Sequence, residues 1–158
     1  MNRRARQHGF TVIEAMIGVL LMAILSLAMV GTFAVGYRTL SQEARQIAAD
    51  NAVNGADMAL TRDLNMATVL PTGTIGGGST VSFNYGAPAS NAVVYSIDGS
   101  KNLIRTLNGT AQVVSRGMNT VTISAPAGTC YATVTLQPSA VGAAARTLNV
   151  ANRPGGCV

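Results

Sequence analysis

The first third of the chain is dominated by apolar side chains. Between Glu14 and Arg38 lie 23 residues without a charge, 15–37. As a helix rising about 1.5 Å per residue, this segment would span the roughly 30 Å hydrocarbon layer of a bilayer. The pattern therefore predicts a transmembrane helix.

Beyond this segment, apolar or small residues recur at steps of three or four, the period of an amphipathic helix. They are Leu40, Ala44, Ala48, Ala52, Ala56, Leu60, Leu64 and Ala67, with Arg38, Gln42, Arg45, Asp50, Asp57 and Thr61 on the opposite face. Because no proline interrupts residues 10–67, we predict one long helix whose second half packs against the domain that follows. Gly31 and Gly36 are its expected weak points, since glycine destabilises a helix by about 1 kcal/mol relative to alanine.

The period changes to two after a loop that Pro71, Gly73 and the glycines of 76–78 predict. Short segments rich in Val, Ile and Thr follow at 81–85, 94–97, 103–107, 113–114, 121–123, 134–136 and 147–150. Such segments are typical of strands, and Asp98-Gly99 and Asn108-Gly109 mark turns between them. The sequence thus predicts an α+β fold, an antiparallel sheet packed on the C-terminal half of the long helix.

The composition argues against an enzyme. His8 is the only histidine, and Asp98 is the only carboxylate after residue 63. Histidine acid–base chemistry, paired-carboxylate hydrolysis and a calcium cage each need groups that this inventory does not supply. We therefore expect no catalytic residue, no cofactor and no metal site.

The positive charge is concentrated at the N-terminus. Arg3, Arg4 and Arg6 precede the apolar segment and supply three units of the formal net charge of +5. Positive residues beside a first apolar helix stay on the cytoplasmic side, so the chain from about Tyr37 onward is expected to face outside.

The remaining charge gives only a weak electrostatic basis for binding nucleic acid. Four scattered arginines are the candidates for phosphate contacts: Arg105, Arg116, Arg146 and Arg153. A solvated face is the commoner explanation for arginines spaced in this way.

Two interpretations of the N-terminus compete. An ordinary secretory signal would use residues 15–25 as its apolar core and Ser26 and Ala28 at its cleavage site. Against this, Glu14 lies just inside the apolar segment, where an ionised carboxylate costs about 2.5–3.5 kcal/mol on insertion scales and usually has a function. The apolar pattern also continues beyond Ala28.

Gly9-Phe10-Thr11-Val12-Ile13-Glu14, between a short basic leader and a long apolar segment, resembles the processing signature of type IV prepilins and type II secretion pseudopilins. The resemblance implies that a membrane-embedded prepilin peptidase cuts between Gly9 and Phe10, on the cytoplasmic side. It further implies that Phe10 is N-methylated and that Glu14 becomes the fifth residue of the mature chain.

Cleavage at this bond creates a second charge close to Glu14. An α-amino group has an ordinary pKa near 7.7–8 and is therefore positively charged at the end of the apolar helix. Between two helices offset along a common axis, the amine of one can meet the Glu14 carboxylate of the next. Because an unpaired charge in lipid is costly, this pairing is expected to join subunits in a fixed register.

Cys130 and Cys157 are the only cysteines. Outside the reducing cytosol they are expected to pair, and the bridge resembles the C-terminal disulfide loop of many type IV pilins. Two unpaired buried thiols are the alternative.

The rest of the chain is more loosely similar to minor pilins and J-type minor pseudopilins, which help to prime or cap filaments. The similarity rests on residues 61–64, on 94–97 with 103–105, on 121–123, and on Asn152-Arg153. The resemblance divides the chain into a leader (1–9), a transmembrane and assembly half of the helix (10–37), an amphipathic half (38–70) and a β-rich head with a disulfide loop (71–158).

The resemblance implies a single-pass protein of the inner membrane, with its head in the periplasm or outside, that later joins a pilus or pseudopilus. The implied partners are other pilins or pseudopilins, the prepilin peptidase, the inner-membrane assembly platform and the lipid bilayer. A structural subunit, minor rather than major, is the leading hypothesis. The alternatives are a type II secretion minor pseudopilin, a filament-displayed subunit for adhesion or for DNA uptake in competence, and an exported enzyme cut after Ala28.

Overall fold

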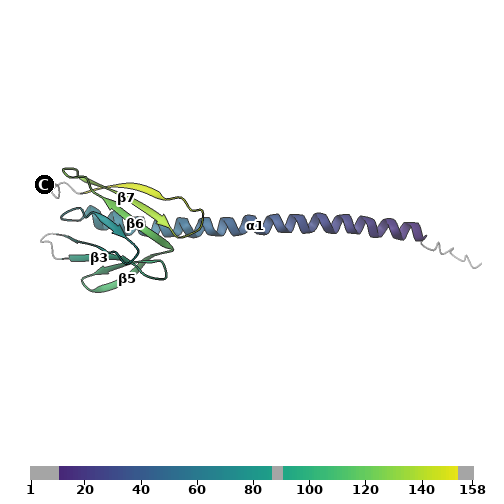
Figure 1. Cartoon of the computed structure of the whole chain (residues 1–158), viewed down its shortest axis with the longest axis horizontal. Helices are drawn as coiled ribbons and strands as arrows, with labels where there is room; N and C mark the ends of the chain where they lie inside the picture. The colour runs from purple at the N-terminus through teal and green to yellow at the C-terminus, as the bar shows by residue number, and fades with distance from the viewer. Residues whose placement is uncertain (1–10, 87–90, 153–158) are drawn as a thin grey trace, which may run out of the picture. The chain divides into compact units, whose positions relative to one another are not determined.

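The computed structural model describes residues 11–86 and 91–152, which form one helix and eight strands (Figure 1). The helix, α1, spans Val12–Asn65, so the prediction of one continuous helix is confirmed. It passes through Gly31 and Gly36 without a break. The strands are β1 (Gly73–Ile75), β2 (Val81–Tyr85), β3 (Asn91–Ile97), β4 (Asn102–Leu107), β5 (Thr110–Arg116), β6 (Met118–Ser124), β7 (Tyr131–Pro138) and β8 (Arg146–Ala151).

Residues at both ends of α1 explain where it begins and stops. The Thr11 carbonyl accepts the backbone N–H groups of Glu14 and Ala15, at 3.1 and 3.2 Å. Threonine followed three residues later by glutamate is the sequence pattern of a capping box, and an acidic residue in the first turn complements the helix dipole. At the other end, the Ala67 N–H bonds the Leu64 carbonyl at 3.2 Å, a tightened last turn that precedes the loop at Pro71.

The chain divides into two compact units, residues 1–43 and 44–158. In the described part of the first unit, every helical side chain from Val12 to Leu40 is exposed. The second unit contains the rest of α1 and all eight strands. The two units are described separately below.

The strands form two antiparallel sheets of four, in the orders β2-β3-β4-β5 and β1-β6-β7-β8. The predicted α+β fold is confirmed, but its antiparallel strands are divided between two sheets instead of forming one. The chain changes sheet at Gly117, whose φ of 81° favours glycine. The N–H groups of Gly117 and Met118 both donate to the Lys101 carbonyl, at 2.8 and 2.9 Å. The chain therefore turns away from β5, and β6 joins the second sheet.

The loop predicted between α1 and β2 contains a strand. Gly73–Ile75 pairs with β6, with Gly73 opposite Ile123 and Ile75 opposite Val121. Ile75 is fully buried in the core. The burial of Ile75 and the pairing of three residues with β6 stabilise this strand although turn-forming residues surround it. Composition alone therefore does not predict β1.

The apolar stripe of α1 is buried only in part. Its members from Ala52 onward, which are Ala52, Ala56, Leu60, Leu64 and Ala67, are buried as predicted. Leu40, Ala44 and Ala48 are exposed, which corrects the prediction for the first three. The sheets add mainly Val93, Tyr95, Leu103, Met118, Val121, Ile123, Val134 and Leu136 to the same core.

Candidate assembly segment

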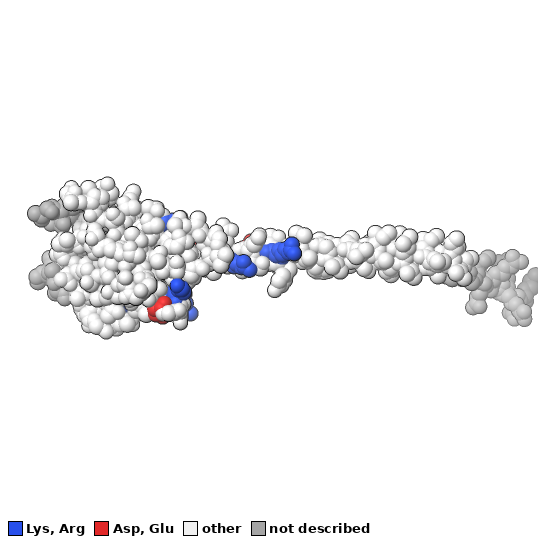
Figure 2. All heavy atoms as spheres, in the orientation of Figure 1, with Lys and Arg blue, Asp and Glu red and all other residues white. Residues whose placement is uncertain are grey.

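The first half of α1 has no partner among the described residues. Its most apolar stretch has a mean hydropathy of 2.4, and none of that stretch is buried. Large side chains such as Val12, Leu27 and Phe33 are at least three-quarters exposed. On the face shown in Figure 2, this part of the helix carries no charged atoms. The helix is long and apolar enough to cross a membrane, and exposed apolar surface on this scale marks a site of membrane or protein contact.

Serine and threonine hydroxyls in the first half of α1 are satisfied by the helix itself. Ser26 and Thr32 each donate to the carbonyl four residues earlier, at 2.7 Å, and Thr39 does so at 3.0 Å. In hydrocarbon an unsatisfied polar group costs several kcal/mol. These internal bonds therefore lower the cost of placing the serine and threonine side chains in lipid.

Glu14 is the one charge at the start of this segment. It lies in the first turn of α1, exposed, and it takes part in neither of the two ion pairs that the described residues form. Its predicted counterpart, the amine of Phe10, falls outside the described residues, as do Gly9 and the leader arginines Arg3, Arg4 and Arg6. The pairing of Glu14 with a neighbouring amine stays a prediction.

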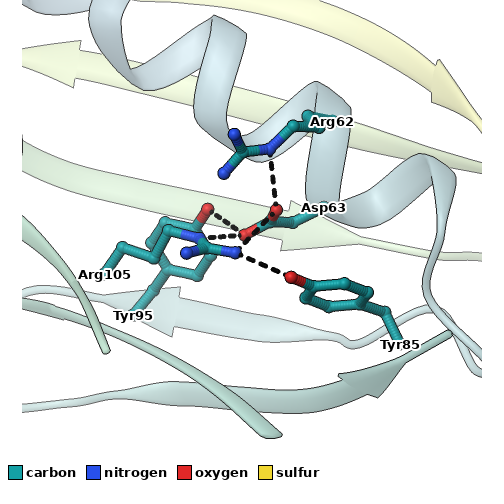
Figure 3. Close-up of polar contacts among 5 residues, drawn as sticks. All are labelled: Arg62, Asp63, Tyr85, Tyr95 and Arg105. Carbon is teal, nitrogen blue, oxygen red and sulfur yellow. Dashed lines mark hydrogen bonds and ion pairs between the residues drawn. The ribbon is translucent and has the colours of Figure 1, made fainter. Parts of the chain in front are cut away.

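The second unit contains a buried polar cluster that was not predicted from the sequence (Figure 3). Asp63, at the end of α1, is fully buried, and its carboxylate accepts the Tyr95 hydroxyl at 2.7 Å and two donors of Arg105. Arg105 is only 5% exposed and also donates to the Tyr85 hydroxyl at 3.1 Å. Arg62, whose side chain is exposed at the surface, donates to the Asp63 carboxylate at 3.3 Å. The cluster ties α1 to β2, β3 and β4.

Burial and charge fix the protonation states of Tyr95 and Arg105. Desolvation and the neighbouring Asp63 carboxylate raise the pKa of Tyr95 well above its ordinary value. The hydrogen bonds to Asp63 raise the pKa of Arg105. Tyr95 therefore remains a neutral donor and Arg105 a cation at every physiological pH.

Arg105 is consequently not a surface residue, which corrects both interpretations given to it from the sequence. Arg116 and Arg146 are exposed, and Arg153 lies outside the described residues. One signal for the cluster was present in the sequence. Asp63 falls seven residues after Ala56, on the apolar stripe of the helix, where a carboxylate needs a partner.

A family model described as the prokaryotic N-terminal methylation motif matches residues 4–30. The match shows that the N-terminal segment of the chain is similar to that of type IV pilins and pseudopilins. The matched residues include Gly9, Phe10 and Glu14 and more than half of the charge-free segment. No curated protein and no solved structure was found to match the chain.

The structure agrees with this pilin-like assignment at the level of the fold. A long N-terminal helix, apolar in its first half, is followed by antiparallel sheets that pack on its second half. Pilins and pseudopilins are structural subunits. In the part of the chain that the structure describes, no three His, Cys, Asp or Glu side chains come together.

Proposed function

We propose that this chain is a minor structural subunit of a type IV pilus or a related filament. The observation that carries the proposal is the methylation motif at residues 4–30, joined to an apolar helical segment whose side chains are exposed in the part of the chain that the structure describes. The subunit is stored in the inner membrane as a single-pass protein, with the leader arginines in the cytoplasm and the head outside. Prepilin peptidase then removes residues 1–9, and Phe10 is methylated.

Assembly in this proposal depends on Glu14. The carboxylate of one subunit pairs with the Phe10 amine of its neighbour, and the exposed apolar helices pack against each other as they leave the bilayer. Each charge removes the cost of burying the other, so the pair specifies the axial register of the packed helices.

The test is Glu14→Gln in the full chain, with Glu43→Gln as the matched control. Both variants replace one exposed helix carboxylate by its amide, but Glu43 lies beyond the charge-free segment. We expect Glu14→Gln to insert and to be cleaved at Gly9 normally, while its amount in sheared filaments falls at least tenfold. The control should remain within about twofold of wild type, the range of a lost exposed ion pair. Normal incorporation of Glu14→Gln would contradict the proposed assembly mechanism.

A type II secretion minor pseudopilin is the alternative that shares this chemistry. A C-terminal disulfide favours the pilus side, by resemblance. Cys157 lies outside the described residues, but the Asn152 N–H bonds the Cys130 carbonyl at 2.8 Å. That bond brings the end of β8 beside Cys130, five residues before Cys157, and so supports the proposed Cys130–Cys157 bridge.

Display of a DNA-binding or adhesive head is a weaker second proposal. Burial of Arg105 removes one of the four candidate phosphate contacts and leaves the exposed Arg116 and Arg146 among the described residues. DNA retention by the detergent-solubilised full chain that falls steeply with salt would support it. Absence of retention at low salt would exclude DNA binding.

A further inference from the structure

The first sheet, β2-β3-β4-β5, has two edges that the chain treats differently. The outward side of β2 is bonded by residues that follow α1. The Thr68 N–H and hydroxyl donate to the Asn84 carbonyl, at 3.0 and 2.6 Å, and the Gly86 N–H donates to the Met66 carbonyl at 3.3 Å. The other edge is β5, whose residues 110–113 are all exposed (Figure 1). A further strand can therefore be added to the sheet at β5.

The backbone of β5 presents hydrogen-bonding groups at this edge. The Asn108 N–H donates to the Ala92 carbonyl at 2.9 Å, which fixes the residues of β4 that bond β3 and those that bond β5. Because antiparallel strands bond at alternate residues, Gln112 bonds β4, while Ala111 and Val113 point their N–H and C=O groups away from it. Among the described residues, no turn, loop or side chain bonds these outward groups.

Residues 110–113 lack the features that keep edge strands from pairing. Natural edges are protected by charged side chains, by proline or by bulges. Thr-Ala-Gln-Val at 110–113 contains no charge and no proline. The irregularity of the β4–β5 ladder comes only after Val113, and the exposed Arg116 comes after the irregularity. This part of the edge is therefore open to another strand.

We propose that β5 pairs with β5 of a second copy of this chain, antiparallel and about a two-fold axis at Gln112. In this register Ala111 of each copy lies opposite Val113 of the other, so their outward N–H and C=O groups bond reciprocally. The pattern is self-complementary, as a two-fold contact requires. Val113, which is 45% exposed, becomes covered. Each Arg116 lies opposite Asn108 of the other copy, so no like charges face each other.

A groove beside β5 has room for the turn of the second copy. The groove has a volume of about 400 Å³ and is lined by Ala48, Asn51 and Ala52 of α1 and by residues 113–116 of β5. The proposed register brings the β4–β5 turn of the second copy, Asn108-Gly109, opposite residues 115 and 116. The alanines leave space for this turn, and the Asn51 amide offers it a hydrogen-bonding group. The groove and the open edge therefore form one continuous docking surface.

The two-fold axis determines how the two copies run. The part of α1 that belongs to the unit 44–158 packs against the sheets, so its axis lies roughly parallel to the first sheet. Rotation about an axis normal to that sheet reverses it, and this part of α1 runs in opposite directions in the two copies. Subunits of one filament share one direction, so the contact joins copies in two different filaments. This last step rests on the proposed function, whereas the dimer itself does not.

Disulfide trapping tests the register. Gln112→Cys places the two new thiols opposite each other at the two-fold axis, with Cα atoms about 4.5 Å apart, within the range of a disulfide. The matched control is Thr110→Cys, another exposed polar residue of β5, whose two copies lie about 13 Å apart in this register. Both full chains are purified in detergent and oxidised. We expect a disulfide-linked dimer from Gln112→Cys and at least about tenfold less from Thr110→Cys. Equal yields would overturn the register.

A charge at the edge tests the pairing without new cysteines. Ala111→Lys places an ammonium group against the second copy, whereas the control, Ser82→Lys, places the same charge on β2 at the covered edge. Sedimentation of the full chain in detergent at a series of concentrations measures the dimer dissociation constant. Ala111→Lys should raise it at least about tenfold, and the control should stay within about twofold of wild type. Equal dissociation constants would overturn pairing through β5.

Mixed filaments separate this inference from the proposed function. Filaments with Gln112→Cys chains that carry two different epitope tags are sheared from two strains, mixed and oxidised, and we expect dimers that contain both tags. Dimers with a single tag only would overturn the contact between filaments. Trapped products that contain only a different protein, or a folded Gln112→Cys chain that yields no dimer, would overturn a second copy as the partner. A chain that dimerises but never enters filaments would overturn the proposed function and leave the dimer.

Discussion

The Asp63 carboxylate is bonded by side chains from two strands and by its neighbour on the helix. Tyr95 comes from β3 and Arg105 from β4, while the Arg62 contact lies at the surface. A buried ion pair adds little to stability relative to apolar residues of the same size, but removing one partner leaves the other charge buried and uncompensated. Asp63 and Arg105 therefore fix how the end of α1 sits on the first sheet.

Asp63→Ala should accordingly lower the free energy of unfolding by about 3–5 kcal/mol, because the Arg105 guanidinium loses its counter-charge. The matched control is Arg62→Gln, since the Arg62 side chain is 60% exposed and its ion pair should contribute at most about 1 kcal/mol. Denaturant unfolding of the full chain in detergent, followed by circular dichroism, measures both. Equal stabilities of Asp63→Ala and the control would show that the cluster does not hold the fold.

Asp98 controls the β3–β4 turn through local hydrogen bonds. Its carboxylate accepts the N–H groups of Ser100 and Asn102, at 2.9 and 2.8 Å, and the Asn102 amide at 2.9 Å. The bonds from Asn102 lower the pKa of Asp98. A lowered folded pKa means that the stabilisation is fully present above the ordinary value of about 3.9 and is lost as the pH falls through the folded value.

Wild type should therefore have a higher unfolding midpoint than Asp98→Asn at pH 7, and the difference should shrink below about pH 4. Thermal unfolding at a series of pH values measures it. A difference that stays constant down to pH 2 would mean that the carboxylate charge is not what stabilises the turn.

At the scale of elements, α1 and β5 approach so closely that only glycine fits at one helical position. A Cβ on Gly55 would lie 2.8 Å from the Val114 carbonyl oxygen, closer than real Cβ contacts allow. Val114 falls at an irregularity of the β4–β5 ladder, where Leu103 pairs with Ser115 and Ile104 with Val113. The Ser115 hydroxyl also bonds the Ala52 carbonyl at 2.6 Å, which fixes the strand against the helix.

Gly55→Ala should therefore destabilise the head by about 1–3 kcal/mol, although alanine favours the helix by about 1 kcal/mol. Gly31→Ala is the matched control, because nothing lies within 4 Å of a Cβ there and only the gain in helix propensity remains. The two unfolding midpoints should move in opposite directions. A stabilised Gly55→Ala would show that the strand can move away at no cost.

The sequence predicted those elements whose period is set by burial on one face. The alternation at residues 81–85 and the turn signal at Asn108-Gly109 correspond to β2 and to the β4–β5 hairpin. It did not predict β1, because a three-residue strand between glycines has no period, nor the division into two sheets, which depends on contacts distant in sequence. Arg105 was misjudged because only the fold brings it to Asp63.

For the whole molecule, the proposed function links processing and methylation of the N-terminus to assembly into a filament. The motif over residues 4–30 supports the proposed function, and the exposed apolar side chains in the first half of α1, among the described residues, offer a surface for a membrane or for neighbouring subunits. The head has its own core and its own ion pair. The proposed function therefore requires that the N-terminus is cleaved and methylated in the cell.

Mass spectrometry of the N-terminal peptide from the native protein tests this most directly. The account predicts a chain that begins at Phe10 and carries one additional methyl group on its amine. A chain that keeps residues 1–9, or one that begins at Met29 after cleavage by signal peptidase, would contradict it.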